Sequence, residues 1–172
     1  MAWFKRESGD LQPTEEKRVR TEGLWVKCDG CRQIIWKKDL AENLNVCGKC
    51  DYHFRIDAPT RLMLLLDEDS IETMDETLAS TDPLNFSDTR PYKSRLEKSQ
   101  EQTGLKDAII NAIGTINGRP VIVSAMEYAF IGGSMGAVVG EAITRGIERA
   151  CEQRKPIIVV SASGGARRME GV

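Results

Sequence analysis

The sequence predicts an α/β protein in which a small four-cysteine metal module precedes a domain with a partly parallel sheet. Two C-x-x-C pairs lie close together in the first third of the chain. Asn117 and Gly118 separate two β-prone runs, and an Asn-Gly pair in this setting is a strong signal for a β-hairpin. A helical apolar stripe over residues 138–151 then precedes four β-branched residues at 157–160. This strand, helix and strand order implies a parallel crossover.

Length and composition allow one ordinary domain plus a small module, and they argue against a membrane protein. The 172 residues are 41% hydrophobic and carry a net charge of −2. No run approaches the roughly 18 apolar residues of a membrane span, and the first ten residues lack the apolar core of a secretion signal. We therefore expect a cytoplasmic protein, in which clustered cysteines are more often metal ligands than disulfides. The small net charge predicts no general attraction to nucleic acid or anionic membranes.

The chain divides into four predicted segments. Residues 1–22 mix charges of both signs with little apolar periodicity, as a flexible leader does. Residues 23–57 hold the metal module. Residues 58–100 are predicted to be a helical and irregular connector, with Thr60 as a candidate helix N-cap. The hairpin and the crossover both fall in residues 101–172.

The spacing of Cys28, Cys31, Cys47 and Cys50 is typical of a zinc ribbon. Each C-x-x-C turn can direct two sulfurs at one point about 2.3 Å from a metal, and two such turns complete a tetrahedron. The 15 residues between the pairs fall within the range of known zinc sites. Four thiolates leave no position for water, so the predicted zinc site is structural rather than catalytic.

Alternatives for these residues stay open. Either C-x-x-C could be a redox pair, although this would leave the other pair unexplained. The pattern could also arise from four unrelated buried cysteines. His53 extends the second pair at the same spacing and could compete as a ligand. The fifth cysteine, Cys151, lies on the apolar helical stripe and is predicted to be a small core residue rather than a nucleophile.

Two Gly-Gly pairs are candidate sites for a carbonyl oxygen or a phosphate. Gly132 and Gly133 precede the predicted helix, and Gly164 and Gly165 follow the last predicted strand. Free amides at a helix N-terminus carry partial positive charge, and glycine leaves room for close approach. With a thioester substrate, the same amides could stabilise an enolate oxygen. The simpler alternative is that both pairs are only turns.

No general base is evident near these glycines. The sequence lacks a G-x-S-x-G elbow, a P-loop lysine and a histidine beside a nucleophile. Arg167 is a candidate ligand for a substrate phosphate or carboxylate, and an exposed arginine in a first helical turn is the alternative. Glu141 and Arg145 fit a surface ion pair four residues apart.

A series of motifs resembles one enzyme family. After the four cysteines come DPLNF, YKSRL, TGLKDAI, FIGGSMGAVVGE and SASGGAR, in this order. Over residues 24–172 the chain resembles the carboxyltransferase beta subunit of bacterial acetyl-CoA carboxylase. The resemblance implies an α/β fold with a crotonase-like (ClpP/crotonase) domain behind the zinc ribbon. It also implies transfer of a carboxyl group from carboxybiotin to acetyl-CoA, which gives malonyl-CoA for fatty-acid synthesis.

The same resemblance implies site residues and partners. Gly164 and Gly165 would donate backbone N–H groups to an oxyanion, and Gly132 and Gly133 would form the neighbouring wall of the acyl-CoA site. The biotin anion itself would remove the acetyl proton, so no histidine base is needed. The implied partners are a carboxyltransferase alpha subunit in an alpha2beta2 assembly, a biotin carboxyl carrier protein and biotin carboxylase. The chain alone is expected to be inactive.

Two departures from the family pattern lead to further expectations. Arg168 stands where the family has methionine, which places a charge in a turn that should pack against protein. The chain stops at Val172, whereas the family continues. We therefore expect a fragment whose incomplete crotonase-like domain leaves a sheet edge unpaired.

A nucleic-acid-binding zinc ribbon is the alternative from another functional class. Basic residues in and just beyond the ribbon would contact phosphates. Acidic residues interleave with them, and four thiolates on one zinc add further negative charge. The basic residues are Lys27, Arg32, Lys37, Lys38, Lys49 and Arg55, and the acidic residues are Asp29, Asp39, Glu42 and Asp51.

Overall fold

The computed structural model describes residues 23–171, and the predicted leader at residues 1–22 lies outside them. The chain forms two compact units that divide between Phe54 and Arg55. None of the helices in the described part of the chain has the length and apolar character needed to cross a membrane.

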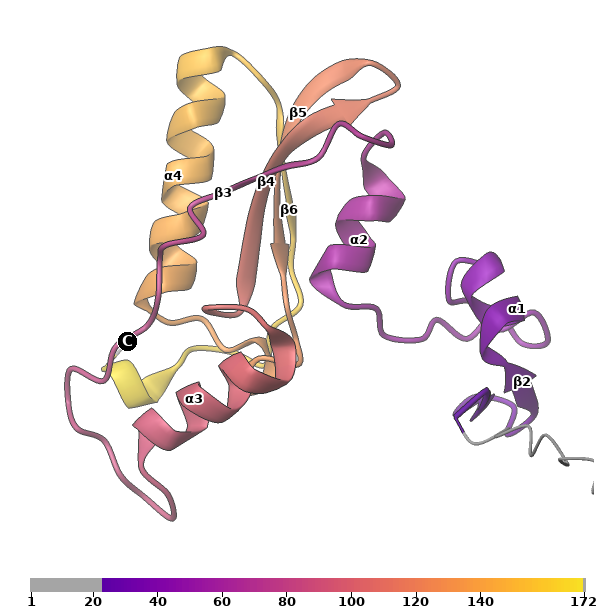
Figure 1. The fold of residues 1–172 in the computed structure, drawn as a ribbon, viewed down its shortest axis with the longest axis horizontal. Helices are drawn as coiled ribbons and strands as arrows, with labels where there is room; N and C mark the ends of the chain where they lie inside the picture. The colour runs from indigo at the N-terminus through magenta and orange to yellow at the C-terminus, as the bar shows by residue number, and fades with distance from the viewer. Residues whose placement is uncertain (1–22, 172) are drawn as a thin grey trace, which may run out of the picture. The chain divides into compact units, whose positions relative to one another are not determined.

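The first unit is a small ribbon with a minimal core. Strands β1 (Trp25–Lys27) and β2 (Ile34–Trp36) pair antiparallel, and helix α1 (Lys37–Glu42) follows directly (Figure 1). Within the described part of this unit, the buried hydrophobic residues are Leu40 and two cysteines, Cys28 and Cys47. So small an apolar core supplies little folding energy, and a unit of this kind depends on bound metal.

The second unit is built on a four-stranded sheet with the order β3-β4-β5-β6. Its strands are β3 (Glu72–Met74), β4 (Ile109–Ile116), β5 (Arg119–Met126) and β6 (Ile157–Val160).

The predicted hairpin and crossover in this sheet are both confirmed. Strands β4 and β5 pair antiparallel across Asn117 and Gly118, whose φ angles of 51° and 74° suit a turn with two left-handed residues. Strand β6 pairs parallel with β5. Among the described residues β6 has a strand partner on one side only.

Helices cover both faces of the sheet (Figure 1). Helix α2 (Ala58–Leu65) packs through Leu62 on the face formed by Val121, Val123 and Ala125 of β5. Helix α4 (Ala137–Gln153) forms the crossover from β5 to β6 and lies on the other face, where a Cβ at Gly146 would lie 3.1 Å from Ser124 Oγ. The sheet is therefore enclosed between α2 and α4, because neighbouring residues of β5 alternate between the two helices.

A third helix packs beyond one end of the sheet. Helix α3 (Tyr92–Thr103) contributes Tyr92 and Leu96 to a second hydrophobic cluster that includes Phe130 and Val139. Two short 3₁₀ turns, η1 (Ile131–Gly133) and η2 (Arg168–Glu170), pack against the same cluster through Ile131 and Met169. Residues 58–100, predicted as a connector, therefore supply α2, β3 and α3 to the second unit.

Two local predictions are wrong. Asp57 caps α2, because its Oδ1 accepts the N–H of Thr60 at 2.8 Å, and Thr60 is not the cap. Cys151 is exposed rather than part of the core. Each pair in the predicted stripe has one buried member. In the last two pairs Gly146 and Ala150 are buried, whereas Ile147 and Cys151 are exposed.

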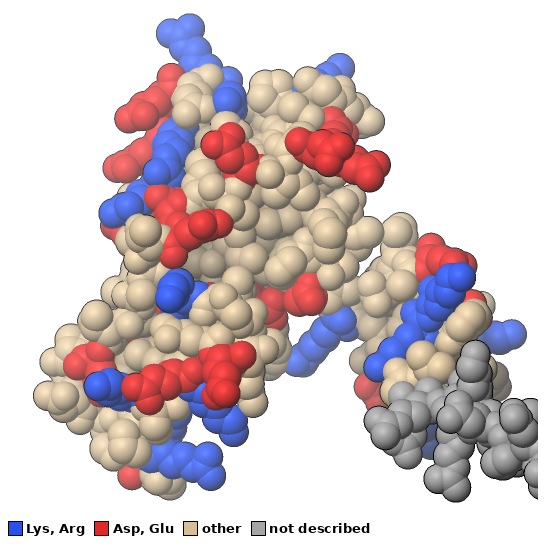
Figure 2. Space-filling view, viewed as in Figure 1, with Lys and Arg blue, Asp and Glu red and all other residues tan. Residues whose placement is uncertain are grey.

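The solvent side of α4 carries charges of both signs (Figure 2). The predicted pair between Glu141 and Arg145 is present, with an Oε1 to Nε distance of 2.7 Å. Arg149 of the same helix binds Asp75, whose side chain is only 5% exposed. Both arginines therefore neutralise carboxylates on or beside this helix.

Candidate functional site

The four predicted cysteines meet at one point in the first unit. Their Sγ atoms all lie within 4.8 Å of one another. The Cys28 and Cys50 sulfurs are 3.7 Å apart, and those of Cys31 and Cys47 are 3.8 Å apart. Zinc–sulfur bonds of about 2.3 Å in a tetrahedron require sulfur separations of about 3.8 Å. The donor set therefore fits structural zinc, the structure brings all four predicted ligands together, and His53 is not part of the group.

The pKa values of two thiols in this group are shifted in opposite directions. The backbone N–H of Lys49 lowers the pKa of Cys47 to about 7. The N–H of Tyr52 also favours the Cys50 thiolate, but desolvation and the neighbouring sulfurs outweigh it and raise the pKa of Cys50 to about 12. Four close thiolates repel one another, and a bound Zn²⁺ holds all of them deprotonated.

The two Gly-Gly pairs lie against each other in the second unit, although 30 residues separate them in sequence. The N–H of Gly164 donates to the carbonyl of Gly132 at 2.9 Å, and the N–H of Met135 donates to the carbonyl of Gly165 at 2.9 Å. We call residues 131–136 the first glycine loop and residues 162–167 the second. These loops follow the adjacent parallel strands β5 and β6, and the carboxyl ends of such strands are where α/β proteins bind ligands.

Close contact between the loops requires glycine at position 133. Gly133 has a φ of 64°, and a Cβ there would lie 2.0 Å from the carbonyl oxygen of Ala162. Gly132 and Gly165 also have positive φ, at 65° and 129°, but neither has an atom within 4 Å of its would-be Cβ. The first glycine loop is therefore shaped by its contact with the second as well as by its own turn.

The predicted oxyanion donors both have hydrogen-bond acceptors within the protein. The Gly164 N–H is used by the backbone bond to Gly132, and the Gly165 N–H donates to Ser163 Oγ at 3.0 Å. A side-chain hydroxyl can rotate away, whereas the backbone bond joins the two loops. Gly165 is therefore the better placed of the two for a substrate oxygen, and the catalytic role of either amide stays a prediction.

Arg167 does not have the surroundings of a substrate ligand. Its side chain is completely buried, so the alternative of an exposed arginine is also wrong. Asp107 accepts two hydrogen bonds from the guanidinium, at 2.6 and 2.8 Å, and Ser134 Oγ accepts another at 3.0 Å. Burial disfavours the charged form, but Asp107 more than compensates and raises the pKa of Arg167. The guanidinium thus lies beneath the loops, while Arg168, in the turn that was expected to pack against protein, is exposed.

The sequence reasoning missed the residues that surround Arg167. Glu170 Oε2 accepts the N–H of Ala137 at the start of α4, and the Tyr92 hydroxyl donates to Glu170 Oε1. Burial raises the pKa of Glu170, but Tyr92, Ala137 and Arg167 outweigh it, and the net pKa is lowered. Asp107 and Tyr92 lie inside the motifs TGLKDAI and YKSRL. The motifs therefore drew attention to these residues, but they did not show that the residues contact Arg167 and Glu170.

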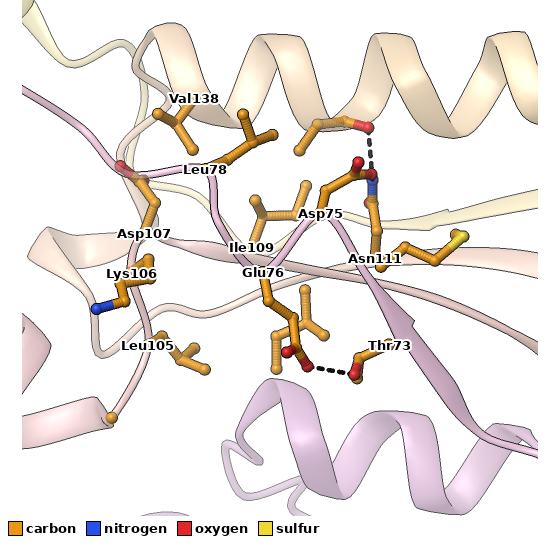
Figure 3. Close-up of a pocket in the computed structure, with 14 residues that line it drawn as sticks. Thr73, Asp75, Glu76, Leu78, Leu105, Lys106, Asp107, Ile109, Asn111 and Val138 are labelled. Carbon is orange, nitrogen blue, oxygen red and sulfur yellow. Dashed lines mark hydrogen bonds between the residues drawn. The ribbon is translucent and has the colours of Figure 1, made fainter.

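A cavity of 370 Å³ lies beside this network and is lined by β3, β4 and α4 (Figure 3). It contains none of the four predicted site glycines. Asp107 and Val138 form part of its wall, and the Asp107 carboxylate points away from the cavity centre, consistent with its bond to Arg167. Asp75 in the wall is neutralised by Arg149. The cavity therefore adjoins the network around Arg167 through Asp107 and includes no residue of either glycine loop.

Comparisons with known proteins agree with this arrangement. Residues 76–172 match the carboxyl transferase domain, and residues 25–50 match the acetyl-CoA carboxylase zinc finger domain. The acetyl-coenzyme A carboxylase carboxyl transferase subunit beta of Citrifermentans bemidjiense is 49% identical over 173 residues, covering 100% of this chain and 61% of that protein. The subunit of the same name from Prochlorococcus marinus is 49% identical over 99% of this chain and 59% of its own length. The chain thus spans 59–61% of these two relatives.

Solved structures show the same fold. Transcarboxylase 12S with hydrolysed methylmalonyl-coenzyme A bound matches with a TM-score of 0.55 at 25% identity, over 68% of this chain and 20% of that chain. A Pseudomonas malonate decarboxylase hetero-tetramer in complex with malonate matches with a TM-score of 0.50 at 26% identity, over 67% of this chain and 40% of that chain. The predicted crotonase-like fold class is confirmed.

Proposed function

Because the chain belongs to the carboxyl transferase domain family, we propose that it serves as the beta component of an acetyl-CoA carboxyltransferase. The reaction moves a carboxyl group from carboxybiotin to acetyl-CoA and gives malonyl-CoA for fatty-acid synthesis. The observation that carries the proposal is the meeting of the two glycine loops at the carboxyl ends of β5 and β6.

The chemistry requires an enolate of the acetyl thioester, whose oxygen gains negative charge as the methyl proton leaves. The second glycine loop offers the Gly165 N–H to that oxygen once the Ser163 hydroxyl rotates away. Gly132 and Gly133 present a wall without side chains, so that a thioester can approach the backbone closely. Carboxybiotin supplies the carboxyl group and, after losing it, the base, which is consistent with the lack of a histidine in the second unit.

The zinc ribbon takes no chemical step in this proposal. Its four thiolates fill the coordination sphere of the metal, so no substrate oxygen can reach the zinc. The proposed enzyme works in the cytoplasm, where the thiolates stay reduced.

The proposed assembly contains several subunits. A carboxyltransferase alpha subunit would complete the active site in an alpha2beta2 assembly, a biotin carboxyl carrier protein would deliver the carboxyl group, and biotin carboxylase would charge that carrier. The name "subunit beta" of the similar proteins supports an assembly of this kind.

The test is reconstitution of the full-length beta polypeptide with its alpha partner. We expect malonyl-CoA-dependent carboxylation of free biotin that requires both polypeptides. Absence of turnover in a correctly assembled, zinc-loaded complex would contradict the proposed function.

One observation favours nucleic-acid binding by the ribbon as a second function. Trp25 and Trp36 are cross-strand neighbours whose rings lie 6.4 Å apart, and they are 55% and 38% exposed. Exposed aromatic rings can stack on unpaired bases. Against this, two of the candidate phosphate contacts, Arg32 and Lys38, each lie 3.9 Å from a carboxylate, which offsets their positive charge. Binding of single-stranded RNA that weakens steeply with salt, and is lost in Trp36→Ala, would support this function, and no binding at low salt would remove it.

A further inference from the structure

We propose that Arg167 is a positioning residue that fixes the two glycine loops relative to each other through its buried ion pair with Asp107. The inference deepens the proposed function and rests on it, because the loops are the proposed site of the thioester. Arg167 touches no space open to a substrate, since its side chain is completely buried.

Arg167 holds the first glycine loop through Ser134, the residue that follows Gly133. Its Nε donates to Ser134 Oγ at 3.0 Å, and its Nη2 donates to the Ser134 carbonyl at 2.8 Å. Its own N–H donates to the carbonyl of Met135 at 2.8 Å. Three bonds from one residue therefore bind the segment that links Gly133 to α4.

Arg167 also belongs to the second glycine loop, two residues after Gly165. Met135 donates its N–H to Gly165 and accepts the N–H of Arg167, so the two loops pair as a short parallel bridge around Met135. A shift of the guanidinium would therefore move both loops together.

Asp107 anchors this arrangement to the sheet. It lies two residues before β4, its side chain is 1% exposed, and its Oδ1 also accepts the N–H of Ala108 at 2.6 Å. Ala108 in turn accepts the N–H of Glu127 just after β5. The backbone next to strands β4 and β5 therefore fixes the Asp107 carboxylate. Arg167, which binds this carboxylate, is held in place by it and in turn holds the loops.

The geometry of the pair suits arginine alone. A planar guanidinium can donate to both oxygens of Asp107 and to Ser134 at once, whereas a lysine ammonium is a point donor on a flexible stem. Because a displacement of about 1 Å at a reacting centre can reduce turnover about 100-fold, loss of the planar contacts is expected to act on catalysis.

The experiment compares Arg167→Lys with a matched control, Asp75→Asn, in the assembled enzyme. Asp75 is another buried carboxylate of the second unit that pairs with an arginine, Arg149, and its hydrogen bonds and ion pairs involve neither glycine loop. For Arg167→Lys we expect kcat to fall about 10- to 100-fold while KM for the CoA substrate stays within about twofold. For Asp75→Asn we expect lower thermal stability with kcat close to wild type.

Turnover close to wild type in folded Arg167→Lys would overturn the proposal, and so would an equal loss of kcat in both variants. If Arg167→Lys does not fold, Ser134→Ala removes only the Oγ contact and should still lower kcat several-fold. No change in kcat for that variant would also overturn the proposal.

A second readout does not depend on activity. The Gly164 N–H bonds across the loops to Gly132, so its hydrogen exchange reports their alignment directly. We expect faster exchange in Arg167→Lys, or in Ser134→Ala, than in Asp75→Asn. If the wild-type complex shows no carboxyltransfer, the proposed function fails, and equal exchange in all variants would separately refute the positioning role.

Discussion

The zinc ribbon and the glycine loops achieve order in opposite ways. The ribbon buries few apolar side chains, and its cysteine ligands fall within a short stretch of chain, so one metal ion organises it. The glycine loops are fixed by contacts between distant residues, such as Arg167 and Asp107, which are 60 positions apart, and they rest on a hydrophobic cluster. The ribbon should therefore respond to loss of metal and the loops to loss of packing, each without the other.

The largest expected effect is the loss of zinc from the ribbon. Cys47→Ser should abolish the one-to-one zinc content and unfold the first unit, because apparent binding free energies of structural zinc sites are roughly 10–16 kcal/mol. The second unit should keep its thermal transition. Metal analysis measures the zinc content, and calorimetry measures the thermal transition of the second unit. Cys151→Ser is the control, since Cys151 is exposed and outside the zinc site. Unchanged zinc content in Cys47→Ser would show that the ligand set is wrong.

The second largest effect should come from the contact between the glycine loops. Gly133→Ala places a Cβ 2.0 Å from the Ala162 carbonyl oxygen at a φ of 64°. We expect it to lower the free energy of unfolding of the second unit by about 3 kcal/mol or more, with zinc content unchanged.

Gly132→Ala is the matched control for this change. Its φ of 65° is nearly the same, but its Cβ meets nothing within 4 Å. Only the backbone strain of about 1–2 kcal/mol should appear. Equal losses in chemical denaturation would mean that strain, and not contact between the loops, explains the need for glycine at position 133.

The two regions also differ in how far sequence alone could predict them. The zinc ligands follow from the spacing of Cys28, Cys31, Cys47 and Cys50, because two turns and one short hairpin bring them together. The hairpin at Asn117 follows from local turn chemistry in the same way.

The site of the second unit could be predicted only in part, because its contacts are long-range. Both Gly-Gly pairs stood out in the sequence, but nothing in their spacing shows that Gly164 bonds to Gly132. Arg167 stood out as a charged residue beside glycines, which suggested a ligand, and its partner Asp107 could be identified only once the sheet was folded. Helical periodicity likewise does not show which edge of the apolar stripe faces solvent. For this reason the prediction that Cys151 is a core residue is wrong.

A smaller effect is expected from acid, which should destabilise the second unit through protonation of Glu170. Contacts with Tyr92, Ala137 and Arg167 lower the pKa of Glu170 below its ordinary value of 4.5, and burial opposes them only in part. A carboxyl group with a lowered folded-state pKa stabilises the fold above 4.5, and this contribution is lost as the pH falls toward the folded-state value.

The variant Glu170→Gln tests this contribution. As the pH is lowered from about 7 to about 3, the Tm of the second unit should fall less steeply in the variant than in wild type. Asp75 has a lowered pKa as well, owing chiefly to Arg149, so part of the acid sensitivity should remain. An identical pH dependence in Glu170→Gln and wild type would contradict the assigned contacts.

The smallest expected effect concerns the boundary between the units. The sequence placed Asp57 at the end of the ribbon, whereas in the structure its carboxylate caps α2 of the second unit. Asp57→Ala should therefore lower the free energy of unfolding of the second unit by about 1 kcal/mol and leave zinc affinity unchanged. Thr60→Ala is the control, because the N–H of Thr60, and not its side chain, makes the capping bond. Weaker zinc binding in Asp57→Ala, measured by chelator competition, would instead assign this residue to the ribbon.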